Sequence, residues 1–375
     1  SKMAYRINPD RNNPWNNLPD LPIDKDLFYT AEIMDKLGET KLSLGKLQGR
    51  SIAIPNQGIL INTISLQEAK ASSAIENIFT TDDELYKAFS EDQVDVMDNR
   101  TKEVLYYREA LWNGHNFLRE REGISSAYFV DLYKVVKQAS DGIRSPLAQI
   151  VIKTGGTGPN AGKVAYTPPR GVGIIEDKLQ KLCNFMNDDI EYKIDPIIKM
   201  AMGHYQFEAI HPFRDGNGRI GRVFNINYLI NKGLLDIPIL YLSRYIIDNK
   251  DDYYALLAGV SQRGDWKRWI MYMLSAVEVT ARLTYDKITD IVAAKDAILD
   301  ALKKDTQIRR PQLLVEMIFV QPFTKVKHFT DKGIYAENTA REYLNKLVEM
   351  KICEKRVISG HHYYSNLELY RILAE

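Results

Sequence analysis

Helical periodicity, interrupted once by a segment rich in glycine and proline, is the feature of this sequence that most restricts its fold. From Ser65 to about residue 304, apolar residues recur at helical spacing, and Glu, Lys and Arg fill the opposite faces. The spacing predicts helices over 65–78, 82–90, 101–119, 127–139, 174–187, 194–210, 219–232, 251–262 and 265–304. We therefore expect a mainly α protein.

The break in this pattern lies at 141–172, where glycines and prolines are frequent and include Gly155, Gly156 and Pro168. Two short β-rich runs, 149–152 and 164–167, lie among them. Short runs of this kind separated by turn residues predict a β-hairpin. We expect it to form a flap inserted in the helical domain.

The two ends of the chain differ from its middle. Repeated Asn and Pro near the start predict an extended arm that is ordered only by packing on other parts of the molecule, and Ser1-Lys2 looks like a cloning remnant before Met3. Near the end, helices are predicted at 311–319, 324–332 and 336–350, followed by a hairpin with its turn at Ser359-Gly360, which is the order of a winged helix-turn-helix. The expected parts are an arm (1–60), N-terminal helices (61–125), a core (126–285), a connecting helix (286–305) and a winged helix (306–375).

Composition excludes several classes of protein. The 375 residues suffice for two or three domains, and 50 basic against 49 acidic side chains give no general attraction to nucleic acid or membranes. No apolar run is long enough for a membrane span, and the N-terminus has no apolar targeting segment. Cys183 and Cys353 are too isolated for a disulfide framework or a zinc site. We expect buried thiols in a cytoplasmic protein.

One segment, 211–222, combines a histidine with a glycine turn and has the residues expected of a binding or catalytic site. Pro212 forces His211 out of the helical region, so the preceding helix ends there and presents the imidazole at a loop. Gly216-Asn217-Gly218 permits a tight turn whose N–H groups converge on an anion at the start of the next helix. Alone, a His-Pro-Phe run is typical of a helix end and a Gly-Asn-Gly run of a turn; together they indicate a phosphate cradle.

Charged residues support this interpretation. Arg219 and Arg222 are spaced i,i+3 on the new helix, so we expect both guanidinium groups to reach the same polyanion. Asp215 would repel phosphates unless it held a divalent cation, and Mg²⁺ is commonly bound by one carboxylate together with phosphate oxygens. The segment predicts a nucleotide-phosphate site with a histidine base.

The segment resembles the signature of the Fic family, H-P-F-x-[DE]-G-N-[GK]-R-x-x-R, at all nine specified positions, and the resemblance covers a helical core from about 60 to 285. It implies transfer of AMP from ATP to a Tyr, Thr or Ser hydroxyl of a protein. His211 would be the base, Asp215 would hold Mg²⁺, the amides of 216–218 with Asn217 would stabilise the developing charge, and Arg219 and Arg222 would bind the β- and γ-phosphates. Arg214 occupies the variable position of the signature. The nucleotide-binding set expected from the resemblance is Ser73, Gln206, Arg214, Asp215, Gly216, Asn217, Gly218, Arg219, Arg222, Tyr253 and Tyr254.

A second stretch resembles the inhibitory-helix motif of the same family, [ST]-x-x-x-E-[GN], through Ser72, Glu76 and Asn77. On sequence alone, an acidic residue near a helix end such as Glu76 is more often a solvated surface carboxylate. The resemblance implies that Glu76 pairs with Arg222 and occupies the position of the γ-phosphate. Because the motif precedes the core, the chain is similar to the self-contained class that is inhibited from its N-terminal side.

The resemblance also assigns the remaining candidate residues. The flap would bind the backbone of the target by strand addition through Val151, Tyr166 and Thr167. The aromatic pair Tyr253-Tyr254 would contact adenine, with Tyr254 preferred and an ordinary core tyrosine as the alternative. Gln206 is a candidate for a ribose or base contact. We expect His204 to be structural, and His361-His362 to be solvated or to face bases without binding metal.

The rival hypothesis is a DNA-binding or protein-binding regulator that acts through the winged helix, with a repressed or degenerate core. From 306 to 375 there are 11 basic and 8 acidic residues, a weak excess for binding nucleic acid. Glu337, Glu342 and Glu349 lie on the expected recognition helix beside Arg341 and Lys346, which favours protein contact or dimerisation. The expected partners are ATP and a protein with an acceptor hydroxyl, including another copy of this chain; a homodimer is left open, nucleic acid is disfavoured, and no membrane partner is expected.

Overall fold

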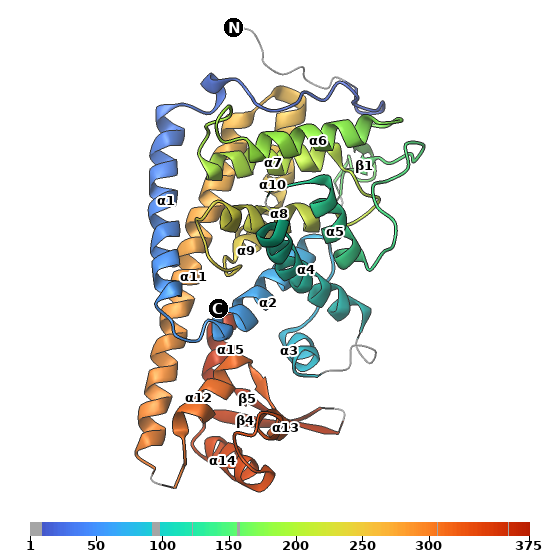
Figure 1. Cartoon of the computed structure of the whole chain (residues 1–375). Coiled ribbons are helices and arrows are strands. Elements are labelled where there is room, and N and C mark those ends of the chain that lie inside the picture. Colours follow the sequence, from blue (N-terminus) through green and yellow to red (C-terminus); the bar gives the residue numbers. More distant parts are fainter. Residues whose placement is uncertain (1–9, 92–97, 122, 156–157, 306, 359) are drawn as a thin grey trace.

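The structure is a computed structural model that describes residues 10–91, 98–121, 123–155, 158–305, 307–358 and 360–375 (Figure 1). The features expected at residues 1–9, at Gly156 and at Ser359 lie outside these ranges. The described chain is mainly helical, as the periodicity predicted. Its helices before the C-terminal region are η1 (Lys25–Leu27), α1 (Ala31–Ile52), α2 (Gly58–Ile75), α3 (Asp82–Ser90), α4 (Asn99–Arg121), α5 (Ser126–Lys137), α6 (Ile174–Asn187), α7 (Pro196–Ile210), α8 (Asn217–Asn231), α9 (Leu242–Asp248), α10 (Lys250–Arg263) and α11 (Trp266–Lys303).

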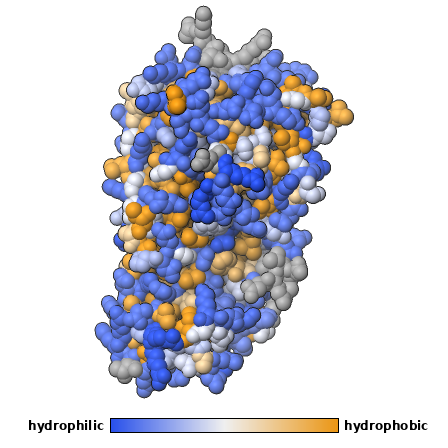
Figure 2. Space-filling view, in the orientation of Figure 1, coloured by the Kyte–Doolittle hydropathy of each residue, from blue (hydrophilic) through white to orange (hydrophobic). Residues whose placement is uncertain are grey.

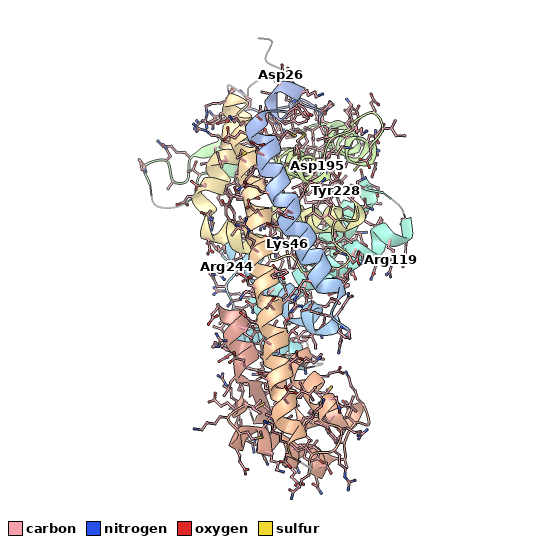
Figure 3. All side chains as sticks on the ribbon, turned by 90° about the vertical axis from the view of Figure 1, so that its left-hand side faces the viewer. Asp26, Lys46, Arg119, Asp195, Tyr228 and Arg244 are labelled. Carbon is pink, nitrogen blue, oxygen red and sulfur yellow. The ribbon has the colours of Figure 1, made fainter. Side chains whose placement is uncertain are left out.

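The expectation of an extended arm through residue 60 is wrong for its second half. Residues 31–52 form α1, which lies side by side with the long helix α11 (Figures 1 and 3). The Thr30 hydroxyl caps the first turn by accepting from Ile33 N, and Leu37, Leu44 and Leu47 are buried at helical spacing. Residues 31–52 thus form a helix because α11 covers their apolar stripe.

Residues 10–24, the described start of the arm, are extended and packed against the rest of the molecule, as predicted. Trp15, Leu18 and Leu21 are buried, and the Trp15 backbone N–H donates to the Thr167 carbonyl at 3.1 Å. The backbone N–H of Arg170 donates to the Asn16 side chain. The arm therefore covers the end of the flap.

Helices α7 and α8 form the centre of the core. Almost every residue of α7 is buried, and α8 is buried along most of its length. Stacked and tilted aromatic rings of Phe129, Phe207 and Phe224 join both helices to α5. His204 is fully buried, as expected for a structural residue: its ring nitrogens contact the Gly221 carbonyl at 3.1 Å and the Tyr253 hydroxyl at 2.6 Å. The loop between the two helices is consequently held by a rigid frame.

The flap is a short antiparallel hairpin of β1 (Ile152–Lys153) and β2 (Val164–Tyr166), in which Ile152 opposes Tyr166. Its strands are shorter than the predicted runs. Outside the core, α9 was not predicted, and the expected connecting helix at 286–305 is not a separate element because α11 runs without a break from Trp266 to Lys303.

The C-terminal region has the predicted order of a winged helix, with additions. It contains α12 (Pro311–Val320), β3 (Phe323–Thr324), α13 (Val326–Asp331), α14 (Glu337–Glu349), β4 (Cys353–Ile358), β5 (His361–Asn366) and α15 (Leu367–Ala374), and its sheet order is β3-β5-β4. Strand β3 and the final helix α15 were not predicted. The region packs on α3, where Arg356 pairs with Asp83 at 2.9 Å and Lys325 pairs with Glu91 at 2.9 Å.

The surface, the length of the apolar segments and the two cysteines can be compared with the expectations from composition. Figure 2 shows hydrophobic and hydrophilic side chains interspersed over one face of the molecule. Among the described helices, none combines the length and the apolar character needed to cross a membrane. Cys183 and Cys353 are buried free thiols, as predicted.

Candidate active site

His211 ends α7 in a left-handed conformation, with φ of 50° and ψ of 61°. Its backbone N–H still donates to the Phe207 carbonyl at 2.9 Å, but Pro212 cannot continue the helix. The Nδ1 atom of His211 is buried and has no hydrogen-bond partner in the described structure. Burial, with a smaller contribution from the nearby Arg144 cation, lowers the pKa of His211 to about 4, so the imidazole is neutral at pH 7.

The glycine turn predicted as a phosphate cradle lies at the start of α8. Gly216 has a φ of 79°, a conformation that glycine adopts without strain, and Asn217 is the first residue of the helix. The Asn217 side chain accepts from Phe213 N at 3.0 Å and donates to Phe213 O at 2.8 Å, so it clamps the loop instead of facing outward. Backbone N–H groups at the N-terminus of α8 are left to meet an anion.

Arg222 and Glu76 form an ion pair at this cradle, with 2.7 Å between Nη2 and Oε1. The guanidinium also donates to Ser72 Oγ at 2.8 Å and to the Ser72 carbonyl at 3.0 Å. Arg222 is only 1% exposed, and its Nη1 has no partner in the described structure. A Cβ at Gly218 would lie 2.2 Å from Glu76 Oε1, so the carboxylate rests directly on the turn. The alternative that Glu76 is a solvated surface carboxylate is therefore wrong.

Two further residues fix the end of α2. Asn77 has a φ of 61°, a left-handed conformation that asparagine tolerates, and it directly follows Glu76. Ser73 is fully buried, and its Oγ has no hydrogen-bond partner in the described structure. Ser73 lies beside Ser72 at the Arg222 contact, and nothing further in the structure gives it a nucleotide-binding role.

The two arginines of the signature do not converge. Arg219 lies 3.3 Å from Glu103 Oε2 on α4, whereas Arg222 pairs with Glu76 on α2. The expectation that both guanidinium groups reach one polyanion stays a prediction, and in this structure they contact different carboxylates. Each arginine instead holds a different carboxylate beside the turn, since a buried cation without an anion would be costly.

Asp215 lies at the mouth of the cradle, and its side chain is 68% exposed. Its Oδ2 pairs with Lys137 Nζ at 2.7 Å, and its Oδ1 accepts from Gly216 N at 2.8 Å. Partial burial would raise the pKa of Asp215, but the Lys137 contacts and the Gly216 N–H lower it overall. The neighbouring Arg214 instead pairs with Asp141 at 2.6 Å on an exposed surface, so the expectation that Arg214 binds nucleotide finds no support.

The two tyrosines have different environments. Tyr253 is buried against His204, which makes it the core tyrosine of the pair. Tyr254 packs edge-on against Tyr253 at 5.2 Å between ring centroids and is 44% exposed. Gln206 is buried and donates to the Pro19 carbonyl at 2.9 Å. The arm thus covers Gln206 in this structure, and the expected ribose or base contact by Gln206 stays a prediction.

The expected docking residues of the flap are only partly available. The Tyr166 hydroxyl donates to the Ala209 carbonyl at 2.6 Å, and the buried Thr167 donates to the Arg11 carbonyl at 2.7 Å. Val151 is exposed and lies just before β1. Tyr166 and Thr167 therefore fix the flap to the core and the arm, and the accessible part of the predicted docking surface is Val151.

Sequence reasoning missed a buried carboxyl group behind the inhibitory motif. Glu68 on α2 accepts from the Tyr107 hydroxyl at 2.7 Å and from both the backbone N–H and the hydroxyl of Ser243. Burial raises the pKa of Glu68 to about 7 despite these bonds. Glu68, Ser72 and Glu76 recur every four residues, and this polar stripe on an apolar helix was visible in the sequence.

Lys137, Arg144 and Glu208 were also missed. Glu208 Oε1 is buried without a hydrogen-bond partner in the described structure, and burial raises the pKa of Glu208 to about 8. Its place one turn before His211 could have drawn attention to it. Arg144 lies in a loop whose composition gave no indication of its contacts.

Comparison with known proteins identifies related segments along most of the chain. Residues 34–116 match the model described as Fic/DOC family N-terminal, and residues 124–229 match the Fic/DOC family model. Residues 299–369 match the model of the C-terminal domain of SoFic-like protein adenylyltransferases. The second match contains the whole cradle, and the third contains nearly all of the winged helix.

Relatives and solved structures agree with these matches. The protein adenylyltransferase fic-1 of Caenorhabditis elegans is 30% identical over 115 residues, which are 31% of this chain and 21% of that protein. The protein adenylyltransferase Fic of Culex quinquefasciatus is 28% identical over 115 residues, 31% of this chain and 22% of that protein. The matched stretch thus spans about one fifth of these relatives.

Structural similarity extends further than sequence similarity. A Fic family protein from Desulfovibrio desulfuricans G20 has a TM-score of 0.54 at 20% identity and covers 92% of this chain and 98% of its own. Residues 134–508 of Fic-1 from C. elegans have a TM-score of 0.51 at 19% identity, covering 69% of this chain and 74% of theirs. At this level of identity the similarity establishes the fold.

Proposed function

This chain is a member of the Fic family, and from that premise we propose that it is a protein adenylyltransferase, which transfers AMP from ATP to a Tyr, Thr or Ser hydroxyl of a target protein. The observation that carries the proposal is the turn between α7 and α8. A neutral histidine, a glycine turn at a helix N-terminus and a buried arginine with an unused donor meet there. The cytoplasmic location expected from the sequence stays a prediction.

His211 would act as the general base. Its neutral imidazole takes the proton of the acceptor hydroxyl as that oxygen attacks the α-phosphorus of ATP. The bond between the α-phosphorus and the oxygen that bridges to the β-phosphate breaks, and pyrophosphate leaves. Since the reaction needs an unprotonated ring, the low pKa of His211 keeps the base available at neutral pH.

The cradle would bind the phosphates. The N–H groups of Asn217 and Gly218 would donate to phosphate oxygens at the positive end of the α8 dipole, and that of Gly216 would have to leave Asp215 Oδ1 to join them. Arg222 offers Nη1, which has no partner among the described residues, and its Nη2 becomes available once Glu76 leaves. Arg219 would have to leave Glu103 to contribute. Tyr254, the exposed member of the tyrosine pair, is the accessible surface for adenine.

Asp215 would hold Mg²⁺ together with oxygens of the α- and β-phosphates. Its carboxylate is exposed, its pKa is lowered, and it already attracts the Lys137 cation, so it suits a divalent cation. Within the described ranges, no cluster of three or more His, Cys, Asp or Glu could hold a metal ion, so the phosphates would have to complete the coordination. When bound, Mg²⁺ would neutralise charge on the phosphates.

We further propose that the chain is autoinhibited. Glu76 neutralises Arg222 at 2.7 Å and rests against Gly218. A carboxylate there repels the γ-phosphate and competes for its ligand, so ATP would bind without the geometry for transfer. Glu76 comes from α2, which precedes the core in the same chain.

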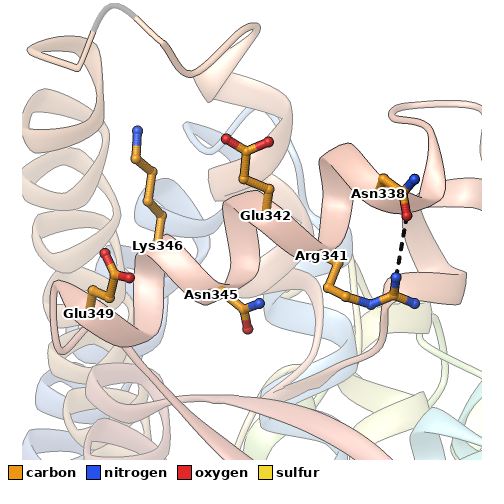
Figure 4. Close-up of a pocket in the computed structure, with 6 residues that line it drawn as sticks. All are labelled: Asn338, Arg341, Glu342, Asn345, Lys346 and Glu349. Atoms are coloured by element: carbon orange, nitrogen blue, oxygen red, sulfur yellow. Dashed lines mark hydrogen bonds between the residues drawn. The ribbon is translucent and has the colours of Figure 1, made fainter.

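The rival function, DNA binding through the winged helix, is not favoured. Figure 4 shows a surface hollow on α14 in which acidic and basic side chains alternate. The residues that line it are Asn338, Arg341, Glu342, Asn345, Lys346 and Glu349. Carboxylates at this position oppose a phosphate backbone, so a protein contact is the more suitable role for α14.

Incubation with α-labelled ATP and Mg²⁺ tests the proposal. Wild type, Glu76→Gly and the combination of Glu76→Gly with His211→Ala are compared for label on the protein itself and on added candidate targets. We expect strong labelling of the single variant and none of the combination. Equal labelling of all three would show that the assigned site does not transfer AMP.

A further inference from the structure

Arg144, in the loop between α5 and β1, is 3% exposed and makes an unusual set of contacts. Its Nε donates to the His211 carbonyl at 2.7 Å, and its Nη2 donates to the carbonyls of Pro169 at 2.6 Å and Ile210 at 3.1 Å. Its own backbone N–H donates to the Pro212 carbonyl at 2.9 Å. These four bonds reach three consecutive residues of the catalytic loop and the exit of the flap.

The loop needs such a partner. The last carbonyls of a helix have no intrahelical donors and form the negative end of its dipole, so a buried cation is favourable there. His211 also adopts a left-handed backbone, which an L-residue holds only when its surroundings enforce it. Among the described residues, no carboxylate forms an ion pair with Arg144, so its donors serve backbone carbonyls.

We propose that Arg144 is a positioning residue for AMP transfer, which fixes the backbone of His211 and ties it to the exit of the flap at Pro169. This inference rests on the proposed function. Arg144 lies outside the 211–222 signature and contacts its first two residues, His211 and Pro212, through their carbonyls. In the described structure none of the hydrogen bonds of Arg144 reaches the cradle residues 216–222, so its action is on the base and not on the phosphates.

This separation predicts a specific kinetic result. Without the guanidinium, residues 210–212 lose the bonds that hold them, and the imidazole moves away from the acceptor hydroxyl. Misplacement of a catalytic group by about 1 Å can cost about 100-fold in rate. The affinity for ATP should be retained because the turn at 216–218 and Arg222 keep their own contacts.

The test uses the full chain in the Glu76→Gly background, where transfer is measurable. We compare kcat, KM for ATP and the dissociation constant of ATP for Arg144→Met and Arg144→Lys. The control is Arg119→Met, at an exposed position of α4. We expect kcat to fall about 10- to 100-fold for methionine, partial recovery for lysine, and unchanged ATP affinity for all three. An unchanged kcat for Arg144→Met would overturn the proposal, and so would loss of ATP binding together with kcat, which would mean that Arg144 only maintains the fold.

A second measurement does not depend on turnover. The ring resonances of His211 in ¹⁵N-histidine NMR spectra should shift and broaden in Arg144→Met and return toward their original positions in Arg144→Lys. Unchanged His211 resonances would overturn the positioning role even if the Glu76→Gly chain transferred no AMP. Failure of the Glu76→Gly chain to label protein would count against the proposed function instead.

Discussion

Two groups of basic side chains in this molecule differ in their surroundings: those buried at the turn between α7 and α8, and those on the surface of α14. Arg222 is buried and pairs with Glu76, and its Nη1 has no partner in the part of the chain that the structure describes. Arg341 on α14 is about half exposed and pairs with Glu337 one turn away at 2.8 Å, while Lys346 pairs with Asp305 at 2.8 Å. Among the described residues, the turn thus has a guanidinium N–H donor without a partner, whereas the basic side chains of α14 are paired with nearby carboxylates.

The difference indicates where an anion binds. Removing a guanidinium from water is costly, and an unused buried donor adds to that cost unless a ligand completes it. Exposed i,i+4 pairs contribute only about 0.3–0.5 kcal/mol and need no ligand. This contrast supports the proposal that the turn, and not α14, binds a polyanion. Five variants or conditions test this comparison, in order of decreasing effect.

The largest effect is expected from His211→Ala. Loss of a general base typically costs about 10²- to 10⁴-fold, whereas the cradle that binds the phosphates is untouched. Initial rates of label incorporation and ATP affinity by calorimetry, both in the Glu76→Gly background, check this. Labelling as fast as that of the parent chain would remove His211 from the mechanism.

Glu76→Gly should raise AMP transfer about 10- to 1,000-fold. The variant removes a negative charge from beside the γ-phosphate position and frees Arg222, and every ~1.4 kcal/mol of productive binding corresponds to a factor of ten in rate. Adding Arg222→Ala should abolish the gain, because both the inhibitory partner and the phosphate ligand are then absent. We would measure the rate of label incorporation for wild type, both single variants and the double variant. A Glu76→Gly rate equal to that of wild type would contradict inhibition by Glu76.

At pH 5.5 the Glu76→Gly chain should retain about ten times more of its neutral-pH rate than an enzyme whose histidine base has the usual pKa. Burial, assisted by Arg144, lowers the pKa of His211 to about 4, and removal of Glu76 eliminates a charge that raises it. The neutral ring therefore persists as the pH falls, and the base should lose little activity between pH 7 and 5.5. A base with the usual pKa of about 6.5 would retain roughly a tenth of its neutral form at pH 5.5. Initial rates at saturating Mg²⁺ distinguish the two profiles.

Lys137→Met should lower the Mg²⁺ concentration required for half-maximal labelling by about two- to fivefold. Lys137 pairs with Asp215 at 2.7 Å, and a pair of this exposure is worth about 0.2–1 kcal/mol. Methionine keeps the apolar stem that lies against Gly216. Lys134→Met, on an exposed position of the same helix, is the control. An equal Mg²⁺ requirement in both variants would mean that Lys137 does not compete with the metal.

Much of the helical core and the central motif could be predicted because their determinants are local. The bounds of α3 and α6 coincide with the predicted ranges, and His211, Gly216 and Arg222 lie where the motif placed them. The miss at α1 has a local cause too, since Gly38, Gly45 and Gly49 dilute its apolar stripe and the Pro-rich arm precedes it.

The contacts at the site that the sequence did not predict join distant parts of the chain. Gln206 donates to Pro19 and Thr167 donates to Arg11, and no local pattern indicates that the arm covers them. Arg219 meets Glu103 on another helix for the same reason. Motif spacing specifies where a backbone turn lies, whereas tertiary packing decides which side chains remain accessible at it.

The smallest effect is expected on α14, where Arg341→Ala combined with Lys346→Ala should leave AMP transfer within about twofold of the parent chain. Both residues are partly or largely exposed, and their carboxylate partners Glu337 and Asp305 become solvated without leaving a buried charge. Point variants are preferable to deletion of the C-terminal region, because deletion would remove Arg356 from Asp83 and disturb α3 next to the inhibitory helix. Mobility shifts of the full chain with random duplexes at about 150 mM salt complete the test. Tight duplex retention that the double variant abolishes would reverse the comparison, since α14 would then be the surface that binds a polyanion.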